Sequence, residues 1–287
     1  MDATNDDSVG YFVFDIESVA EPALVSLVRT SGEKSPEEAV EEYRAELLEK
    51  KGTDFIPYAY HVPISLALAK VRPDFSLLDL VSLKFEDGGP KRICERFWSG
   101  WRYYKRPQLV TFNGRGFDIP LLELTAFRYG IPLPEWYDDQ KPSYQQYRNR
   151  YSGAHFDLYD FLTNYGASVI IGGQNLVAKL IRKPGKMDVK GDMVQDLLAT
   201  GRFEEIHRYC RCDVLDAYLI FLRASLLRGK ISPDREKELV EETREFLRER
   251  RDEEPVYGEY LEAWDQTIEF FESNDSIGRW LEQSRSR

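Results

Sequence analysis

An apolar, β-rich run at residues 11–16, YFVFDI, constrains the fold of this 287-residue chain more than any other feature of its sequence. Aromatic and β-branched residues favour extended structure, and a run with so little polarity predicts a buried central strand. Asp15 and Glu17 stand at the end of this run, with one residue between them. Because side chains two positions apart leave a strand on the same face, we expect both carboxylates to emerge together at its end.

The rest of the sequence alternates predicted strands and helices. Further strands are expected at residues 62–70, 76–83, 109–112 and 155–158, and further helices at 91–104, 118–129, 175–182, 191–200 and 203–225. A helix at 35–50 opens with a capping box formed by Ser35 and Glu38. Beyond Pro233 the chain is expected to be helical, with a break near Pro255. Three strands in a meander, then alternating helices and strands, predict an α/β fold in which helices flank a mixed sheet.

The net charge of −11 is concentrated in two segments. Residues 233–287 hold 17 acidic against 9 basic side chains, and residues 33–54 hold 8 against 4, which leaves +1 for the rest of the chain. Proteins that bind nucleic acid usually carry basic surfaces, because phosphates attract Lys and Arg. Since the acidity is peripheral, it does not exclude a polyanionic substrate.

The cellular compartment is predicted from the termini and the cysteines. No apolar run approaches the length that crosses a bilayer, and the acidic start MDATNDDSVG does not resemble a signal peptide. Cys94, Cys210 and Cys212 form neither a disulfide framework nor a zinc motif, and we expect them to be inert. The sequence therefore predicts a cytoplasmic protein without membrane contact.

Two more carboxylates stand at positions suited to a shared metal site. Asp118 opens a predicted helix directly after the strand 109–112, and Asp213 lies inside the helix that begins near residue 203. Tyr209 is one helical turn before Asp213, so both side chains project from the same side. Carboxylates suit Mg²⁺ and Mn²⁺ better than zinc, and two such ions about 4 Å apart activate water for phosphodiester hydrolysis. Tyr209 could orient the attacking water, although a phenol with a pKa near 10 is a poor base.

Three motifs resemble those of the DEDD (DnaQ-like) exonuclease superfamily. FDIES at 14–18 resembles the first motif and TFNGRGFDIP at 111–120 the second. YCRCD at 209–213 resembles the third motif in its tyrosine form, in which Tyr is followed by three residues and Asp. The stretch 185–223 is similar throughout to the predicted 3′-5′ exonucleases related to the proofreading domains of family-B DNA polymerases. The order and separation of the motifs also match, which indicates the DEDDy branch.

The resemblance implies a fold and a domain organisation. The fold is expected to be ribonuclease-H-like, with a mixed five-stranded sheet flanked by helices and with extra C-terminal helices. The exonuclease domain is expected at residues 9–228, with an acidic helical insertion near 33–54. Residues 229–287 are expected to form an acidic helical extension packed on that domain.

The resemblance also implies a site and a reaction. Two Mg²⁺ or Mn²⁺ ions are expected on four carboxylates, with a tyrosine as a further catalytic group: Asp15, Glu17, Asp118, Asp213 and Tyr209. Substrate binding is expected at Asn113, Phe117 and Ser18, where Ser18 stands at a position often held by Thr. The implied reaction is stepwise hydrolysis at the 3′ end of single-stranded or frayed DNA, which releases nucleoside monophosphates. An RNA exonuclease and a catalytically silent nucleic-acid-binding module on the same fold remain alternatives, and a protein partner is unknown.

Each candidate residue has a structural alternative. Asp15 and Glu17 could end a strand in solvent, and Asp118 could stabilise a helix dipole. Asp213 could pair with Arg208 or Arg211, and Tyr209 could simply pack in the core.

Other polar residues are assigned to less specific roles. Asp157 is expected beside the site, Asp216 in a solvated or structural role, and GRG at 114–116 in a tight turn that places Asp118. The three histidines, His61, His155 and His207, are expected at the surface or as satisfied core residues. PSYQQYRNRY at 142–151 interleaves aromatics with Arg, as strand-binding surfaces do. The basic side chains that could contact phosphates are Lys179, Arg182, Lys183, Lys186 and Lys190.

Overall fold

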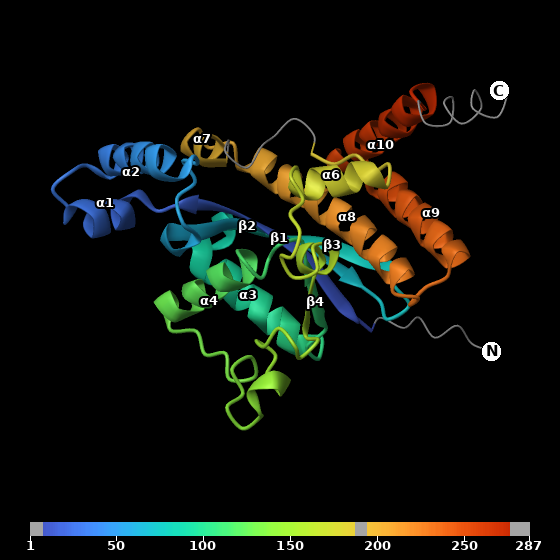
Figure 1. Ribbon diagram of the computed structural model, residues 1–287, viewed down its shortest axis with the longest axis horizontal. Coiled ribbons are helices and arrows are strands. Elements are labelled where there is room, and N and C mark those ends of the chain that lie inside the picture. The colour runs from blue at the N-terminus through green and yellow to red at the C-terminus, as the bar shows by residue number, and fades with distance from the viewer. Residues whose placement is uncertain (1–7, 187–193, 276–287) are drawn as a thin grey trace.

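The computed structural model describes residues 8–186 and 194–275 (Figure 1). Five strands form one mixed sheet in the order β3-β2-β1-β4-β5. The strands are β1 (Tyr11–Ala20), β2 (His61–Val71), β3 (Leu77–Lys84), β4 (Gln108–Thr111) and β5 (His155–Asp157). The pairs β1–β2 and β2–β3 are antiparallel, whereas β1–β4 and β4–β5 are parallel. This arrangement confirms the ribonuclease-H-like α/β fold, with the acidic strand β1 at the centre of the sheet.

Strand β1 is longer than the sequence analysis predicted. Its pairing with β2 continues to Ala20, with an irregularity between Glu17 and Ser18. The predicted end of the strand at residue 16 was therefore wrong, because β2 offers a partner along the whole length and Val19 and Ala20 are buried. Strand β4 pairs only with the first three residues of β1. The two carboxylates consequently lie inside β1, at the point where its other edge has lost its partner.

Helices cover both faces of the sheet (Figure 1). The long helix α8 (Phe203–Leu227) packs on one face, and α3 (Gly89–Tyr103) with α4 (Asp118–Tyr129) packs on the other. The alternation of β1 decides which side chain meets which helix. Phe12, Phe14 and Ile16 are buried against α3 and α4, whereas Val13 faces α8. Asp15 and Glu17 lie on the same face of β1 as Val13. They therefore project toward α8, which carries Asp213.

Several short helices complete the chain between the larger elements. Their bounds are η1 (Tyr58–Tyr60), η2 (Phe85–Asp87), η3 (Ser143–Gln145), α5 (Leu158–Leu162), α6 (Gly173–Leu180) and α7 (Val194–Ala199). Helix α7 falls within the predicted helix 191–200, whose first residues lie outside the described part of the chain. Across residues 8–186 and 194–275, no helix combines the length and the apolarity that crossing a bilayer requires.

A helical hairpin follows the end of β1 and projects to one side of the sheet (Figure 1). It consists of α1 (Pro22–Thr30) and α2 (Pro36–Lys51). Helix α2 begins as predicted, since the Ser35 hydroxyl accepts from the Glu38 N–H and the Glu38 carboxylate accepts from the Ser35 N–H, at 3.3 and 3.0 Å. The hairpin has a small core of its own, formed by Ala20, Val25, Ala39, Val40, Tyr43, Leu47 and Ile56.

Two further helices, α9 (Pro233–Arg250) and α10 (Val256–Ser273), pack against α8, with the predicted break before Pro255. Leu239, Tyr260 and Trp264 from these helices join the core that α8 forms with the sheet. Tyr260 donates to the Asp216 carboxylate at 2.7 Å, and Asp216 is 1% exposed. The expectation that Asp216 could be solvated was therefore wrong, because α10 covers this side of α8.

Candidate active site

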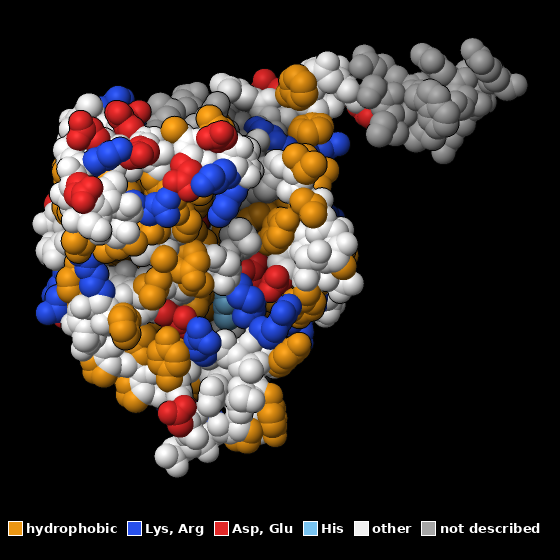
Figure 2. All heavy atoms as spheres, turned by 60° about the vertical axis from the view of Figure 1, so that its left-hand side comes forward, with side chains coloured by type: hydrophobic (Ala, Val, Ile, Leu, Met, Phe, Trp, Pro, Cys, Tyr) orange, Lys and Arg blue, Asp and Glu red, His pale blue; other side chains and the backbone are white. Residues whose placement is uncertain are grey.

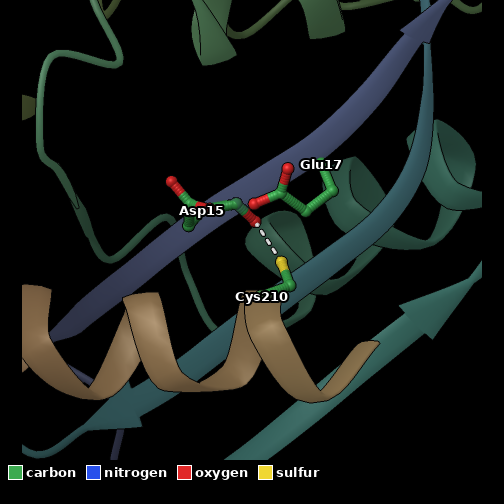
Figure 3. Close-up of side chains that lie close together, drawn as sticks. All are labelled: Asp15, Glu17 and Cys210. Atoms are coloured by element: carbon green, nitrogen blue, oxygen red, sulfur yellow. Dashed lines mark hydrogen bonds between the residues drawn. The ribbon is translucent and has the colours of Figure 1, made fainter. Parts of the chain in front are cut away.

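Asp15 and Glu17 point to the same side of β1, and Glu17 folds its carboxylate toward Asp15 (Figure 3). One ligand atom from each of these residues and from Cys210 lie within 4.8 Å of one another. Glu17 is only 9% exposed. A strand that ended in solvent would leave Glu17 hydrated, so that structural alternative does not describe Glu17, whereas Asp15 is partly exposed. The spacing of one residue between two acids has produced the shared face that the sequence predicted.

Cys210 belongs to this cluster by distance, but its chemistry differs from that of the carboxylates. Its thiol donates to the backbone carbonyl of Asp15 at 3.4 Å and accepts from the Ala67 N–H at 3.3 Å (Figure 3). Burial raises the pKa of this thiol well above its usual range, so it stays protonated. Hard cations such as Mg²⁺ prefer oxygen ligands. We therefore assign Cys210 to holding β1 against α8.

Asp118 is the first residue of α4 and reaches the same region from the other side of β1. Its side chain is 4% exposed, and within residues 8–186 and 194–275 its Oδ1 atom has no hydrogen-bond partner. A buried carboxylate oxygen without a donor is costly unless a cation balances it. Backbone hydrogen bonding at Ile16 and at Asp118 itself engages the carboxylate. Stabilisation of the α4 dipole by Asp118 does not by itself explain why its Oδ1 atom lacks a hydrogen-bond partner.

Asp213 and Tyr209 face the cluster from α8, as their spacing of four residues predicted. The Tyr209 side chain lies beside the Asp213 carboxylate and partly offsets the rise of its pKa. Arg208 and Arg211, the alternative partners of Asp213, instead pair with Glu259 and Glu254.

The electrostatics of the four carboxylates indicate that they interact strongly. Burial raises the pKa of Glu17 to about 8, of Asp118 to about 7 and of Asp213 to about 6. Burial also raises the pKa of Asp15 well above its usual range, and the charges of Asp118, Glu17 and Asp213 raise it further. The charge of Lys186 acts in the opposite direction on Asp15. Asp15 and Glu17, whose pKa values are raised by burial and by the charges of Asp118 and Asp213, lie in a site that fits a divalent cation.

The loop that precedes Asp118 is held in place by Asp157. The Asp157 carboxylate accepts from the backbone N–H of Asn113 at 3.0 Å and of Arg115 at 2.8 Å, and it also caps α5. Asn113 has a φ of 65°, a left-handed conformation that Asn tolerates better than most residues. A Cβ atom at Gly114 would lie 2.8 Å from Oδ2 of Asp118. The GRG turn and the position of Asp157 beside the site follow the sequence analysis.

The three predicted substrate-binding residues lie around this cluster in different settings. Ser18 donates to Nδ1 of His61 at 3.0 Å, and Asn113 is exposed. Phe117 forms an aromatic cluster with its neighbours, with ring centroids 5.8 Å from Phe55 and 5.9 Å from His61. Tyr58 completes the cluster at 6.5 Å from Phe117. Roles for these side chains in substrate binding stay predictions.

The histidines have hydrogen-bond partners outside the carboxylate cluster. His61 bonds Ser18, His155 bonds Thr111 at 2.7 Å, and His207 bonds Ser65 at 2.8 Å.

Basic and aromatic side chains surround the site unevenly. Figure 2, which brings the side of α1 and α2 forward, shows acidic and basic side chains around a hollow near the centre of this face. Lys186 lies 5.3 Å from the Tyr209 ring centroid, and its charge lowers the pKa of Asp15. Lys183 is 9% exposed and lies over Trp264, so it does not offer its charge to a phosphate in solvent. Lys190 lies outside the described residues.

The Arg- and Tyr-rich segment 142–151 is irregular apart from the short helix η3. Tyr144 and Tyr151 are 58% and 77% exposed, and the Arg150 guanidinium lies 4.8 Å from the Tyr165 ring centroid. Binding of a nucleic-acid strand by this segment stays a prediction.

Sequence reasoning missed residues that have no motif of their own. Arg44, from the helical hairpin, lines a pocket beside Ser18, and the hairpin also brings Phe55 against Phe117. The only available signal was that the hairpin follows directly after β1 in the chain.

A ribonuclease-H-like sheet with carboxylates from β1, α4 and α8 acting on one another defines the class as an α/β protein with a candidate metal site. The chain belongs to the family of predicted 3′-5′ exonucleases related to the exonuclease domain of PolB, whose family model matches residues 53–264. The match begins after β1, so the evidence for Asp15 and Glu17 is the geometry described above.

Two polymerases are similar to parts of this chain. A DNA polymerase of Archaeoglobus fulgidus is 25% identical over 156 residues, which are 52% of this chain and 20% of the polymerase. The structure of the family B DNA polymerase of Pyrobaculum calidifontis covers 76% of this chain at 17% identity and a TM-score of 0.49. The chain thus spans about a fifth of one polymerase and, at 24%, about a quarter of the other.

Proposed function

We propose that this protein is a divalent-metal-dependent 3′-5′ exonuclease that shortens single-stranded or frayed DNA and releases nucleoside monophosphates. The observation that carries the proposal is that carboxylates from three distant segments act on one another: Glu17, Asp118 and Asp213 are buried, and their charges raise the pKa of the partly exposed Asp15. Their mutual repulsion is reflected in the raised pKa of Asp15 and Glu17. Such a cluster is unfavourable without a cation, and its ligand set suits Mg²⁺ or Mn²⁺.

Asp15, Glu17, Asp118 and Asp213 would hold two ions, which when bound would activate a water and stabilise charge on the attacking and leaving oxygens. The scissile phosphate would then lie next to these carboxylates, between β1 and α8. The orphaned Oδ1 of Asp118 is the ligand atom with the clearest lack of a protein partner among the described residues.

Tyr209 would act by hydrogen bonding. Burial raises its pKa, and the charges of Asp213, Glu17 and Asp15 raise it further, so its hydroxyl stays protonated at neutral pH. The ring lies beside the Asp213 carboxylate, next to the cluster. From this position it can orient a water and exclude others, and it does not need to remove a proton.

The substrate would approach along the aromatic cluster of Phe55, Tyr58, His61 and Phe117. Bases of a single strand stack on such rings, whereas paired bases inside a duplex are not available to them. This favours an unpaired 3′ end. DNA is the proposed substrate, and RNA is the alternative to be separated by experiment.

We also propose a domain organisation and a location. Residues 9–228 would be the exonuclease domain and residues 229–287 an extension packed on it, supported by the shared core of α8, α9 and α10. The family match, which runs to residue 264, includes α9 and part of α10. A cytoplasmic location is supported by the three free, buried cysteines.

Replacement of one proposed ligand tests the function directly. Asp15→Ala and Asp213→Ala should reduce release of mononucleotides from a 5′-labelled single strand by at least about 10²-fold, as expected for removal of a principal electrostatic group. The assay compares single-stranded DNA, a duplex with a frayed end and RNA, each with Mg²⁺, Mn²⁺ or chelator. Asp139→Ala, at an exposed acid outside the cluster, is the matched control. Undiminished cleavage by both ligand variants, or cleavage that survives chelation, would contradict the proposal.

A further inference from the structure

A pocket of about 130 Å³ begins one residue beyond Glu17. Its lining comes from the end of β1, from α2, from the segment before β2 and from the start of α7: Ser18, Val19, Ala20, Arg44, Asp54, Phe55, Ile56, His61 and Gln195. The hairpin of α1 and α2 therefore contributes to a pocket that adjoins the proposed metal site. From Glu17 to Val19 the strand advances about 7 Å, at roughly 3.3 Å per residue. That length is comparable to the separation between the phosphate and the base of one nucleotide.

Arg44 contributes a donor to this pocket. Its Nε atom is buried, and across the two described segments it has no hydrogen-bond acceptor. A buried donor without an acceptor is unfavourable, because water no longer solvates it. A ligand that supplies an acceptor would remove this penalty.

His61 cannot supply that acceptor. Its Nε2 atom lies 3.0 Å from the Ile56 carbonyl, which can only accept, so Nε2 carries the proton. Its Nδ1 atom then accepts from the Ser18 hydroxyl at 3.0 Å. Burial lowers the pKa of His61 to about 4, so the ring stays neutral. Both ring nitrogens are thus engaged, so His61 leaves the Arg44 Nε donor without a partner among the described residues.

The other walls favour a flat, aromatic ligand. Phe55 lies 5.2 Å from the His61 ring and 5.8 Å from Phe117, measured between centroids, and it is 53% exposed. Val19, Ala20 and Ile56 are apolar. A cavity of roughly 150 Å³ holds benzene, so a pocket of this size admits one aromatic ring. The carboxylate of Asp54 offers an acceptor for a ring N–H or an amino group.

We infer that this pocket receives the base of the 3′-terminal nucleotide and that Arg44 determines how strongly the enzyme prefers an end that carries a base. The inference rests on the proposed function, since it assigns the pocket to the nucleotide whose phosphate lies at the carboxylates. Every nucleobase presents an acceptor, either a ring nitrogen or a carbonyl oxygen, to which Arg44 can donate. The helical hairpin is then part of the substrate site.

Two oligonucleotides that differ only at the 3′ terminus test the inference. One ends in an ordinary nucleotide and the other in an abasic residue, and kcat/KM for the first cleavage is measured for both. We expect the unmodified protein to prefer the ordinary end by about 10-fold or more, as for a hydrogen bond to a charged group. Arg44→Met should abolish most of that preference by slowing the ordinary end alone. Lys51→Met, at an exposed cation on the same helix, should leave it unchanged.

A binding measurement separates this inference from the proposed function. In Asp15→Asn, the affinity for the two oligonucleotides is compared with and without Arg44→Met, and the same loss of preference is expected. If no protein cleaves either oligonucleotide, the exonuclease proposal fails while the affinity ratio still tests the pocket. Arg44→Lys, which lacks the Nε donor but keeps the charge, serves if Arg44→Met does not fold. An equal preference with and without Arg44, in cleavage or in binding, would overturn the inference.

Discussion

Gly114 occupies the place where the loop before α4 passes closest to Asp118. A Cβ atom there would lie 2.4 Å from Oγ1 of Thr111 and 2.8 Å from Oδ2 of Asp118. Neither contact is sterically acceptable, and Thr111 is itself fixed by His155 at 2.7 Å. The loop can therefore accept a side chain at this position only if Asp118 moves.

Gly114→Ala should consequently reduce activity much more than the addition of a single methyl group suggests. We expect a loss of about 1–3 kcal/mol in stability from overpacking. A displacement of Asp118 by about 1 Å should also lower kcat by about 10²-fold. Gly116→Ala is the matched control, because a Cβ atom at Gly116 would lie no closer than 3.4 Å to its nearest neighbour. Thermal melts and initial rates on both variants check the prediction, which fails if the two variants behave alike.

At the scale of elements, the site depends on how β4, α4 and α5 are joined. Asp157 ends β5, caps α5 and binds the backbone of the loop that leads from β4 to α4. One carboxylate thus determines the positions of three elements. Its oxygens are used unequally: Oδ1 accepts from Asn113, Tyr159 and Asp160, whereas Oδ2 accepts from Arg115.

Two replacements of Asp157 should therefore differ in severity. Asp157→Asn keeps one carbonyl oxygen for Oδ1 and a good N-cap, so we expect a small loss of stability and a partial loss of activity. Asp157→Ala removes the cap and both loop contacts, and it should cost about 2 kcal/mol or more, with a larger loss of activity. Denaturant unfolding and cleavage rates measure the series. Equal effects of Asn and Ala would show that hydrogen bonding is not what this residue contributes.

The predicted elements agree with the observed ones where local patterns are strong. The capping box of Ser35 starts α2, and Asp118 is the first residue of α4, as expected. Helix α1 was not predicted, and its N-cap Glu21 makes no side-chain capping bond. The extension of β1 to Ala20 was not predictable either, because it depends on a partner in β2 about 40 residues away.

At the scale of the whole molecule, the buried carboxylates link stability to pH and to metal. In the unfolded chain these groups titrate near pH 4, whereas in the folded protein Asp213, Asp118 and Glu17 titrate at about 6, 7 and 8. Their raised pKa means that the folded state binds protons more tightly than the unfolded state. The stabilisation from these protons is complete below about pH 4 and is lost as the pH rises through about 6 to 8.

Mg²⁺ should therefore stabilise the protein more at high pH than at low pH, because it competes with protons for the same oxygens. We expect the increase in Tm between chelator and 10 mM Mg²⁺, a concentration of the order used for weak sites, to be small at pH 6 and several degrees at pH 8.5. Other titrating groups, such as Lys183 with its pKa lowered to about 7, cancel in this difference. Asp15→Asn should weaken the effect. A metal-induced shift that is independent of pH would argue against the carboxylates as ligands.

The sequence alone determined the local chemistry of this protein. The alternation of β1 places Asp15 and Glu17 on one face, the helical repeat places Tyr209 and Asp213 on one side, and Gly114 leaves room for Asp118. These relations involve residues a few positions apart, so backbone geometry is sufficient to predict them.

Only the tertiary structure decided what these local units form together. The pairing of β4 with just the first part of β1, the approach of α8 and the position of the α1–α2 hairpin bring distant side chains within reach. Burial follows from that packing, and it is burial that raises the carboxylate pKa values and leaves the Arg44 donor without water. Such effects depend on contacts across tens to hundreds of residues, which no local pattern encodes.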